Sequence, residues 1–335
     1  MQEIDYKGVN TILRTYELKI LAEADYDRML KASSLKDALD VLKGTGYEFD
    51  EKETLMNKNF EGFLIKHLAE VYQDLFSITP VAEIVELFAL RYTYHNLKVL
   101  LKQRFSGEDL EQLLIPIGKY SIASLKKLVE TGDGNDEHPI LIEGVQEAIR
   151  DFDEGHRIEA ATIFMDTYYF RHLRSISDKL QHPSIAKMVN GMIDLYNLST
   201  IIRSLKQNKP RGFLYTVLSS SGSISKRDLI EESINGPSAV MRKHYFNKEY
   251  GARLSNMISD TTNEIDTQKL DKLVDELTYE LIAEGLYQPF GPIPLLGYLF
   301  AKEKEVTNIR LILVGKDNQI DEQILRERMR PIYGS

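Results

Sequence analysis

One helical pattern occurs three times along the chain. In each copy a proline is followed 14 or 16 residues later by an asparagine that precedes leucine or isoleucine, and an apolar stripe comes after this pair. Proline is tolerated in the first turn of a helix, where its missing N–H would have no helical partner, so each proline is expected to open a long helix that contains the asparagine. The pairs are Pro80 and Asn96, Pro183 and Asn197, and Pro292 and Asn308.

A weaker fourth copy of the pattern lies near the N-terminus, at Asn10. The first three asparagines in chain order are followed, 24 to 28 residues later, by a serine in a sequence typical of a helix N-cap. These serines are Ser34, Ser121 and Ser225. Four copies enclose three full periods, which predicts three similar helical units, with the two chain ends sharing one of them.

The remaining sequence also favours helices. Apolar residues recur three and four positions apart in residues 60–75, 165–180 and 270–281. We expect an all-α fold with approximate repeats at residues 10–95, 96–196 and 197–308, and with 309–335 completing a ring. Units of this length exceed the common solenoid repeats of about 20 to 50 residues. Closure about an axis is therefore expected instead of a linear stack, whose apolar ends would need caps.

The recurring asparagine has two interpretations. A polar side chain inside an apolar helix commonly bonds to a neighbouring helix and fixes its register, which would suit a repeated interface. Alternatively, the amides of Asn96, Asn197 and Asn308 could bind one ligand on the axis. We favour the structural role, because a buried polar group left unpaired costs about 1 to 3 kcal/mol.

Composition excludes several functional classes. A net charge of -9 argues against a nucleic-acid binder, because such proteins concentrate Lys and Arg against phosphates. The chain has no cysteine, so disulfides, thiol nucleophiles and cysteine-ligated metals are excluded. None of its glycines forms a phosphate-binding loop, and no histidine pair has the spacing of a helical zinc protease.

Two short segments resemble functional motifs and are better explained otherwise. The acidic stretch 133–137 begins like a calcium loop, but His138 and Gly144 stand where the turn glycine and the bidentate acid belong, which favours a solvated loop that ends at Pro139. Residues 219–222 lack the strand-turn-helix setting of a nucleophile elbow, so a flexible linker is expected there. The sequence predicts no catalytic, cofactor-binding or metal-binding residue.

The longest stretch without a charged residue, 285–301, cannot span a bilayer because it contains three prolines. The first ten residues show neither a signal nor a transit peptide. We therefore expect a cytoplasmic protein without direct lipid insertion, which reaches any membrane through another protein.

Several segments together resemble the C subunit of the prokaryotic V-type (A/V-type) rotary ATPases, the homologue of the d subunit of vacuolar ATPases. The similarity rests on the order and spacing of these segments over essentially the whole chain. They are residues 9–14 (VNTILR), 33–39 (SSLKDAL), 94–102 (YHNLKVLLK), 166–170 (DTYYF) and 193–198 (IDLYNL).

The resemblance implies a funnel of three similar helical subdomains with pseudo-threefold symmetry about a central cavity. It implies a non-catalytic protein that couples the D and F subunits of the central stalk to the membrane rotor ring of proteolipid subunits, and so ATP hydrolysis or synthesis to proton or sodium transport. Phe290, Leu295 and Leu296 would be candidates for a ring-facing surface, although the same run also fits a buried core helix. The alternatives are an unrelated cytosolic helical scaffold and an unrecognised hydrolase.

Overall fold

A computed structural model describes residues 6–155, 158–258, 267–283 and 290–332. The described residues form α-helices, a few short 3-10 and π turns and connecting loops, and they contain no strand. The expectation of an all-α fold is confirmed. Within these ranges no helix has an apolar stretch long enough to cross a bilayer.

The chain forms two compact units. Unit 1 comprises residues 1–89 together with 279–335, and unit 2 comprises residues 90–278. The two chain ends therefore share one unit, while the division into three repeats stays a prediction.

The helices of unit 1 are α1 (Lys7–Glu17), α2 (Glu23–Lys31), α3 (Leu35–Asp40), α4 (Glu51–Asn57), α5 (Phe60–Ile78), α16 (Ile293–Asp317) and α17 (Glu322–Arg328). Those of unit 2 are α7 (Ile122–Thr131), α8 (Pro139–Gly155), α9 (Ile158–Leu180), α10 (Pro183–Lys206), α11 (Arg211–Val217), α12 (Lys226–Glu232), α13 (Pro237–Val240) and α14 (Gly251–Ser255), with a π turn at Met241–Tyr245. Two helices contribute residues to both units: α6 (Ala82–Ser106) and α15 (Thr267–Ala283).

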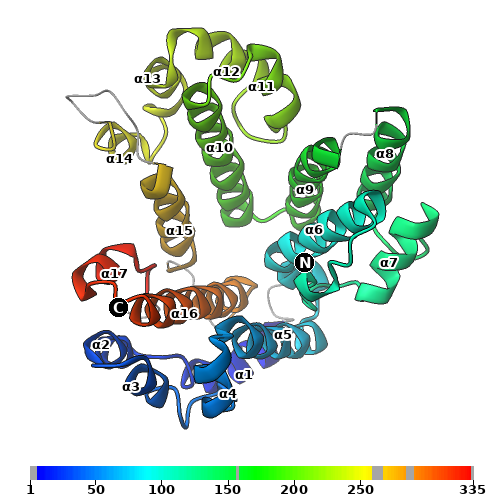
Figure 1. The fold of residues 1–335 in the computed structure, drawn as a ribbon. Coiled ribbons are helices and arrows are strands. Elements are labelled where there is room, and N and C mark those ends of the chain that lie inside the picture. Colours follow the sequence, from blue (N-terminus) through cyan, green and yellow to red (C-terminus); the bar gives the residue numbers. More distant parts are fainter. Residues whose placement is uncertain (1–5, 156–157, 259–266, 284–289, 333–335) are drawn as a thin grey trace. The chain divides into compact units, whose positions relative to one another are not determined.

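Helix α16 is the centre of unit 1. It packs against α1, α2, α3, α5 and α17, and Figure 1 shows it, in orange to red, beside the blue N-terminal helices. Every residue from Ile293 to Glu303 is buried. A helix that is buried on all sides has no solvent-facing stripe, and this explains why its first half is a continuous apolar run.

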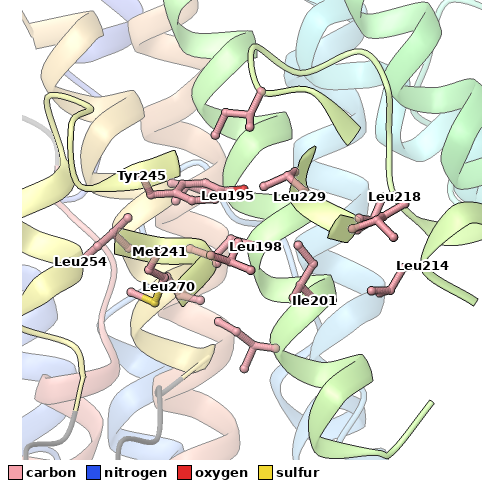
Figure 2. Close-up of a cluster of buried hydrophobic side chains, with 14 of the residues drawn as sticks. Leu195, Leu198, Ile201, Leu214, Leu218, Leu229, Met241, Tyr245, Leu254 and Leu270 are labelled. Carbon is pink, nitrogen blue, oxygen red and sulfur yellow. The ribbon is translucent and has the colours of Figure 1, made fainter. Parts of the chain in front are cut away.

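Helix α10 organises unit 2. Its Leu195, Leu198 and Ile201 are buried in a cluster that also receives apolar side chains from α11, α12, α14, α15 and the π turn (Figure 2). Earlier in the chain, α8 packs along α9, and α9 packs against α10. The core of unit 2 thus joins helices that follow one another closely in sequence.

The predicted helix starts agree with the structure. Pro183 is the first residue of α10, Pro292 is the N-cap of α16, and Pro80 lies two residues before α6. The side chains of Ser34, Ser121 and Ser225 each accept a hydrogen bond from the N–H three residues on, so each predicted serine caps its helix. These three helices are α3, α7 and α12.

Candidate functional site

Each of the three repeated asparagines lies on a long helix and is almost fully buried. Asn96 is on α6, Asn197 on α10 and Asn308 on α16, and their exposed fractions are 1%, 0% and 1%. In every case the side-chain amide forms two hydrogen bonds with the backbone of a single residue further along the chain. We call this arrangement an asparagine clamp.

The three clamps have the same geometry. Asn96 Nδ2 donates to the carbonyl of Ile115 at 2.7 Å, and its Oδ1 accepts from the N–H of Ile115 at 2.8 Å. Asn197 holds Ser219 with distances of 2.9 and 2.8 Å. Asn308 holds Arg330 with 3.1 and 2.8 Å. An amide used in this way replaces the partner that a neighbouring strand would give to an isolated stretch of backbone.

These contacts bear on the two interpretations of the asparagine. Both the oxygen and the nitrogen of each amide are engaged with backbone, which favours the structural role over an axial ligand. The partner, however, is a residue in a loop and not a neighbouring helix. In the first two clamps the held residue is followed six positions later by the capping serine, Ser121 or Ser225. The clamp therefore fixes the path of the chain into the next helix.

The fourth copy, at Asn10, makes a different contact. Asn10 lies on α1, is buried, and donates from Nδ2 to the carbonyl of Gly291 at 3.2 Å. Gly291 has a positive φ of 82° directly before the start of α16, a conformation that favours glycine. Asn10 thus joins α1 to the start of α16.

The expectation of a flexible linker at residues 219–222 is wrong. Besides the clamp on Ser219, Arg174 Nε donates to the carbonyl of Ser221 at 2.9 Å, and Asp194 Oδ1 accepts from the N–H of Ser223 at 2.8 Å. A Cβ at Gly222 would collide with Asp194 Oδ1. Serine and glycine are small enough for three side chains to reach the backbone here. Composition alone therefore predicts a flexible segment where the fold has one that is held by hydrogen bonds.

The acidic stretch before Pro139 is only partly the solvated loop that was expected. The side chain of Glu137 is buried and accepts hydrogen bonds from Ser124 Oγ and from the N–H of Asn135, the latter at 2.9 Å. Its carboxylate ties the loop to α7. Among the described residues no group of three or more His, Asp or Glu is arranged to hold a metal ion.

A buried histidine lies near this loop. The ring of His172 on α9 stacks on that of His138 with centroids 4.1 Å apart, and its Nδ1 is 3.3 Å from the hydroxyl of Tyr94. Burial, with help from the charges of His138 and Lys119, lowers the pKa of His172 to about 3. The imidazole is therefore neutral at physiological pH and behaves as a core side chain.

A buried charge network on α16 has no signal in the sequence. Residues 302–305 read Lys-Glu-Lys-Glu, a pattern typical of a solvated surface, yet Lys302, Glu303 and Glu305 are all buried. Lys302 Nζ lies 2.7 Å from Glu305 Oε1, with both side chains at most 3% exposed. Alternating charge cannot reveal such a site, because burial is decided by the helices that α16 packs against.

The suggested ring-facing residues are mostly inside unit 1. Leu295 and Leu296 are 0% and 1% exposed, so their place on a ring-facing surface is wrong, and the favoured interpretation of a buried core helix is the one that the structure has. The physical reason is that α16 packs against five other helices of its unit. Phe290, just before the helix, is 41% exposed. Residues 285–289 of the uncharged run lie outside the described residues.

Comparisons with known proteins extend over nearly the whole chain. The profile of the family described as ATP synthase (C/AC39) subunit matches residues 9–328. The C subunit of the V-type sodium ATPase of Enterococcus hirae is 30% identical over 333 residues, which cover 98% of this chain and 99% of that protein. The C subunit of the A-type ATP synthase of Methanocaldococcus jannaschii is 25% identical over 350 residues, covering 96% and 85%.

Proposed function

The chain belongs to the ATP synthase (C/AC39) subunit family, as a C subunit of the V/A-type ATPases, and from this we propose that it is a non-catalytic part of the central stalk. It would couple the rotating D and F subunits of the stalk to the membrane rotor ring. ATP hydrolysis or synthesis in the catalytic head would thereby be linked to transport of protons or sodium ions. Membership of this family rules out the alternative of a helical scaffold unrelated to these ATPases.

The observation that carries this proposal is the end-to-end match to the C subunit of a sodium ATPase, which leaves almost no residue of either chain uncovered. A match of this extent indicates that the two proteins share their whole architecture. We therefore extend the non-catalytic role, the cytoplasmic position beside the membrane and the partners of the family to this chain.

We further propose that the fold comprises three similar subdomains, near residues 10–95, 96–196 and 197–308 with 309–335, arranged as a funnel with pseudo-threefold symmetry. The three asparagine clamps support this, because the same two hydrogen bonds recur at Asn96, Asn197 and Asn308. A cryo-electron microscopy structure of the assembled complex tests it. Three subdomains that could not be superposed on one another would contradict it.

A coupling protein has to be stiff, since rotation that is absorbed by its own deformation under torque does not reach the ion-transporting ring. Clamped loops and a central helix whose first half is buried on all sides are features that resist deformation. Contacts of at least ordinary protein–protein size, about 1,600 Å² in total, are expected against each neighbour.

The coupling role can be tested by removing and restoring this chain. Affinity-tagged chain expressed in its own cell should co-purify with the D and F subunits and with the ring. A complex reassembled without it should retain ATP hydrolysis by the catalytic head but lose ATP-driven ion transport, and added chain should restore transport. Recovery of the chain alone, or ATP hydrolysis by the purified chain, would contradict the proposal.

Phe290 remains a proposed contact with the ring. Phe290→Asp places a charge on this half-exposed aromatic position and should reduce co-purification of the ring at least about tenfold, a loss of roughly 1.4 kcal/mol, while the D and F subunits stay bound. Tyr215→Asp, at an exposed aromatic position in unit 2, serves as the matched control. Equal recovery of the ring by the two variants would show that Phe290 does not contribute to the interface with the ring.

A further inference from the structure

The apolar half of α16 contributes much buried surface to the core of unit 1, but it does not determine how the helix is rotated about its axis or shifted along it. Nine successive residues, from Ile293 to Ala301, carry no charge and are buried. Turning the helix by one position, about 100° with a rise of 1.5 Å, would replace one apolar side chain by another at every contact. Hydrophobic burial is non-directional, so it discriminates weakly between such arrangements.

The charged residues that follow make contacts of the opposite kind. Glu305 accepts a hydrogen bond from the N–H of Leu21 at 2.6 Å and from the hydroxyl of Tyr47 at 2.7 Å, in addition to its ion pair with Lys302. Glu303 accepts from the hydroxyl of Tyr72 at 2.5 Å. Each of these bonds has a narrow range of distance and angle.

The donors come from three separate segments of the first 89 residues. Leu21 lies between α1 and α2, Tyr47 between α3 and α4, and Tyr72 on α5. Glu303 and Glu305 are two positions apart on α16 and therefore point in directions that differ by about 160°. The helix is thus held from two sides by groups that are more than 230 residues away in sequence.

We infer that the Lys302, Glu303 and Glu305 network sets the register of α16 in unit 1, and that its main role is to select one arrangement of this helix among several that apolar packing would accept. A slip by one residue would move a carboxylate by about 1.5 Å along the axis and swing it to another side of the helix, out of hydrogen-bonding range. The ion pair between Lys302 and Glu305 lies within α16 and would move with the helix, so the register depends on the bonds that Glu303 and Glu305 accept from Leu21, Tyr47 and Tyr72.

Buried charged groups often contribute little net stability compared with apolar residues of similar size, while they disfavour alternative arrangements in which their hydrogen bonds would be lost. Stability and register can therefore be separated by experiment. Glu305→Gln leaves Lys302 unpaired and should lower the melting temperature by about 10 °C. Replacing the set with Lys302→Met, Glu305→Leu and Tyr47→Phe should recover part of that loss, because the buried ammonium and its counter-ion are then removed together.

The register itself can be measured with spin labels, since the full-length chain has no cysteine of its own. Labels at Lys66→Cys on α5 and Val314→Cys on α16 occupy exposed positions of the two packed helices. Their electron–electron distance distribution should be narrow in the parent protein. In the triple variant it should become broad or bimodal, with components displaced by about 1.5 to 5.4 Å.

Arg326→Gln is the matched control. It removes an ion pair to Asp27 that also joins the C-terminal to the N-terminal segment of unit 1 but is exposed, and it should leave the distribution narrow. If the triple variant keeps the narrow distribution, Glu303→Leu and Tyr72→Phe are added to remove the remaining bond of the network. A distribution that is still narrow overturns the inference, because packing alone then sets the register. If the triple variant does not fold, the double variant Tyr47→Phe and Tyr72→Phe decides, because it removes a hydroxyl donor from each carboxylate and keeps the ion pair with Lys302. Broadening supports the inference, and an unchanged distribution overturns it.

Discussion

The clamp at Asn197 should be one of the most sensitive positions in unit 2. Asn197→Leu keeps the size of the side chain but removes the partner of both the N–H and the carbonyl of Ser219. Ser219 is itself buried, so water does not replace the lost bonds readily. Each buried backbone group left unpaired costs about 1 to 3 kcal/mol, and we expect the free energy of unfolding to fall by about 2 to 5 kcal/mol.

Urea unfolding followed by circular dichroism measures this change, and hydrogen exchange locates it. The N–H of Ser219 should exchange at least about thirtyfold faster, the factor that corresponds to roughly 2 kcal/mol. Asn235→Leu is the control, because Asn235 is exposed and its amide bonds to the side chain of Glu232 instead of to loop backbone; its effect should stay within about 0.5 kcal/mol.

The same substitution at Asn96 and Asn308 should cost less than at Asn197. Their clamped partners, Ile115 and Arg330, are only partly buried, so water can satisfy some of the bonds that are lost. If Asn197→Leu proves no more damaging than Asn235→Leu, the clamps do not stabilise the fold and their recurrence needs another explanation.

Three further outcomes follow from the same structure. The pKa of His172 is about 3 in the folded protein and 6.5 ordinarily, so the unfolded state binds the proton first as pH falls. Stability from the neutral imidazole is complete above pH 6.5, and about 2 kcal/mol of it should be lost between pH 7 and 5. His172→Gln should remove this pH dependence of the unfolding free energy, as measured by urea unfolding at several pH values. Gly222→Ala should lower the unfolding free energy by about 1 to 3 kcal/mol, because its Cβ displaces Asp194. Gly191→Ala, in open space on α10, should raise it by about 0.5 to 1 kcal/mol, and equal effects of the two variants would show that no such collision occurs. Ser121→Ala should cost about 1 kcal/mol through the lost cap of α7, and restored stability in Ser121→Asp would check that the cap is responsible.

The helices and their starts were predictable because their signals are local. A proline or a capping serine acts on the first turn of its own helix, and apolar spacing reports the buried face of a single helix. The starts of α10 and α16, at Pro183 and Pro292, could therefore be located without knowing what these helices pack against.

The partners of the buried polar groups were not predictable in this way. Asn197 could be recognised by its recurrence, but its partner Ser219 lies 22 residues away, in a segment whose composition indicates a flexible linker. Lys302 and Glu305 lacked even a recurrence to mark them. Burial of a charged residue depends on the tertiary neighbours of its helix, and a single sequence does not contain that information in a local form.

The position of α16 also has a consequence for how unit 1 assembles. Helices α1 to α5 are made first, but the helix that fills their core begins at Ile293, and the carboxylate that binds the N–H of Leu21 is 284 residues further along the chain. Unit 2, in contrast, is continuous in sequence from residue 90 to 278. Because α16 is synthesised after unit 2, unit 1 has to complete its core last, by closing a long loop at a cost in chain entropy that slows folding. A network that admits only one register of α16 selects that register at this late step, because the helix enters a site whose apolar walls would accept several registers.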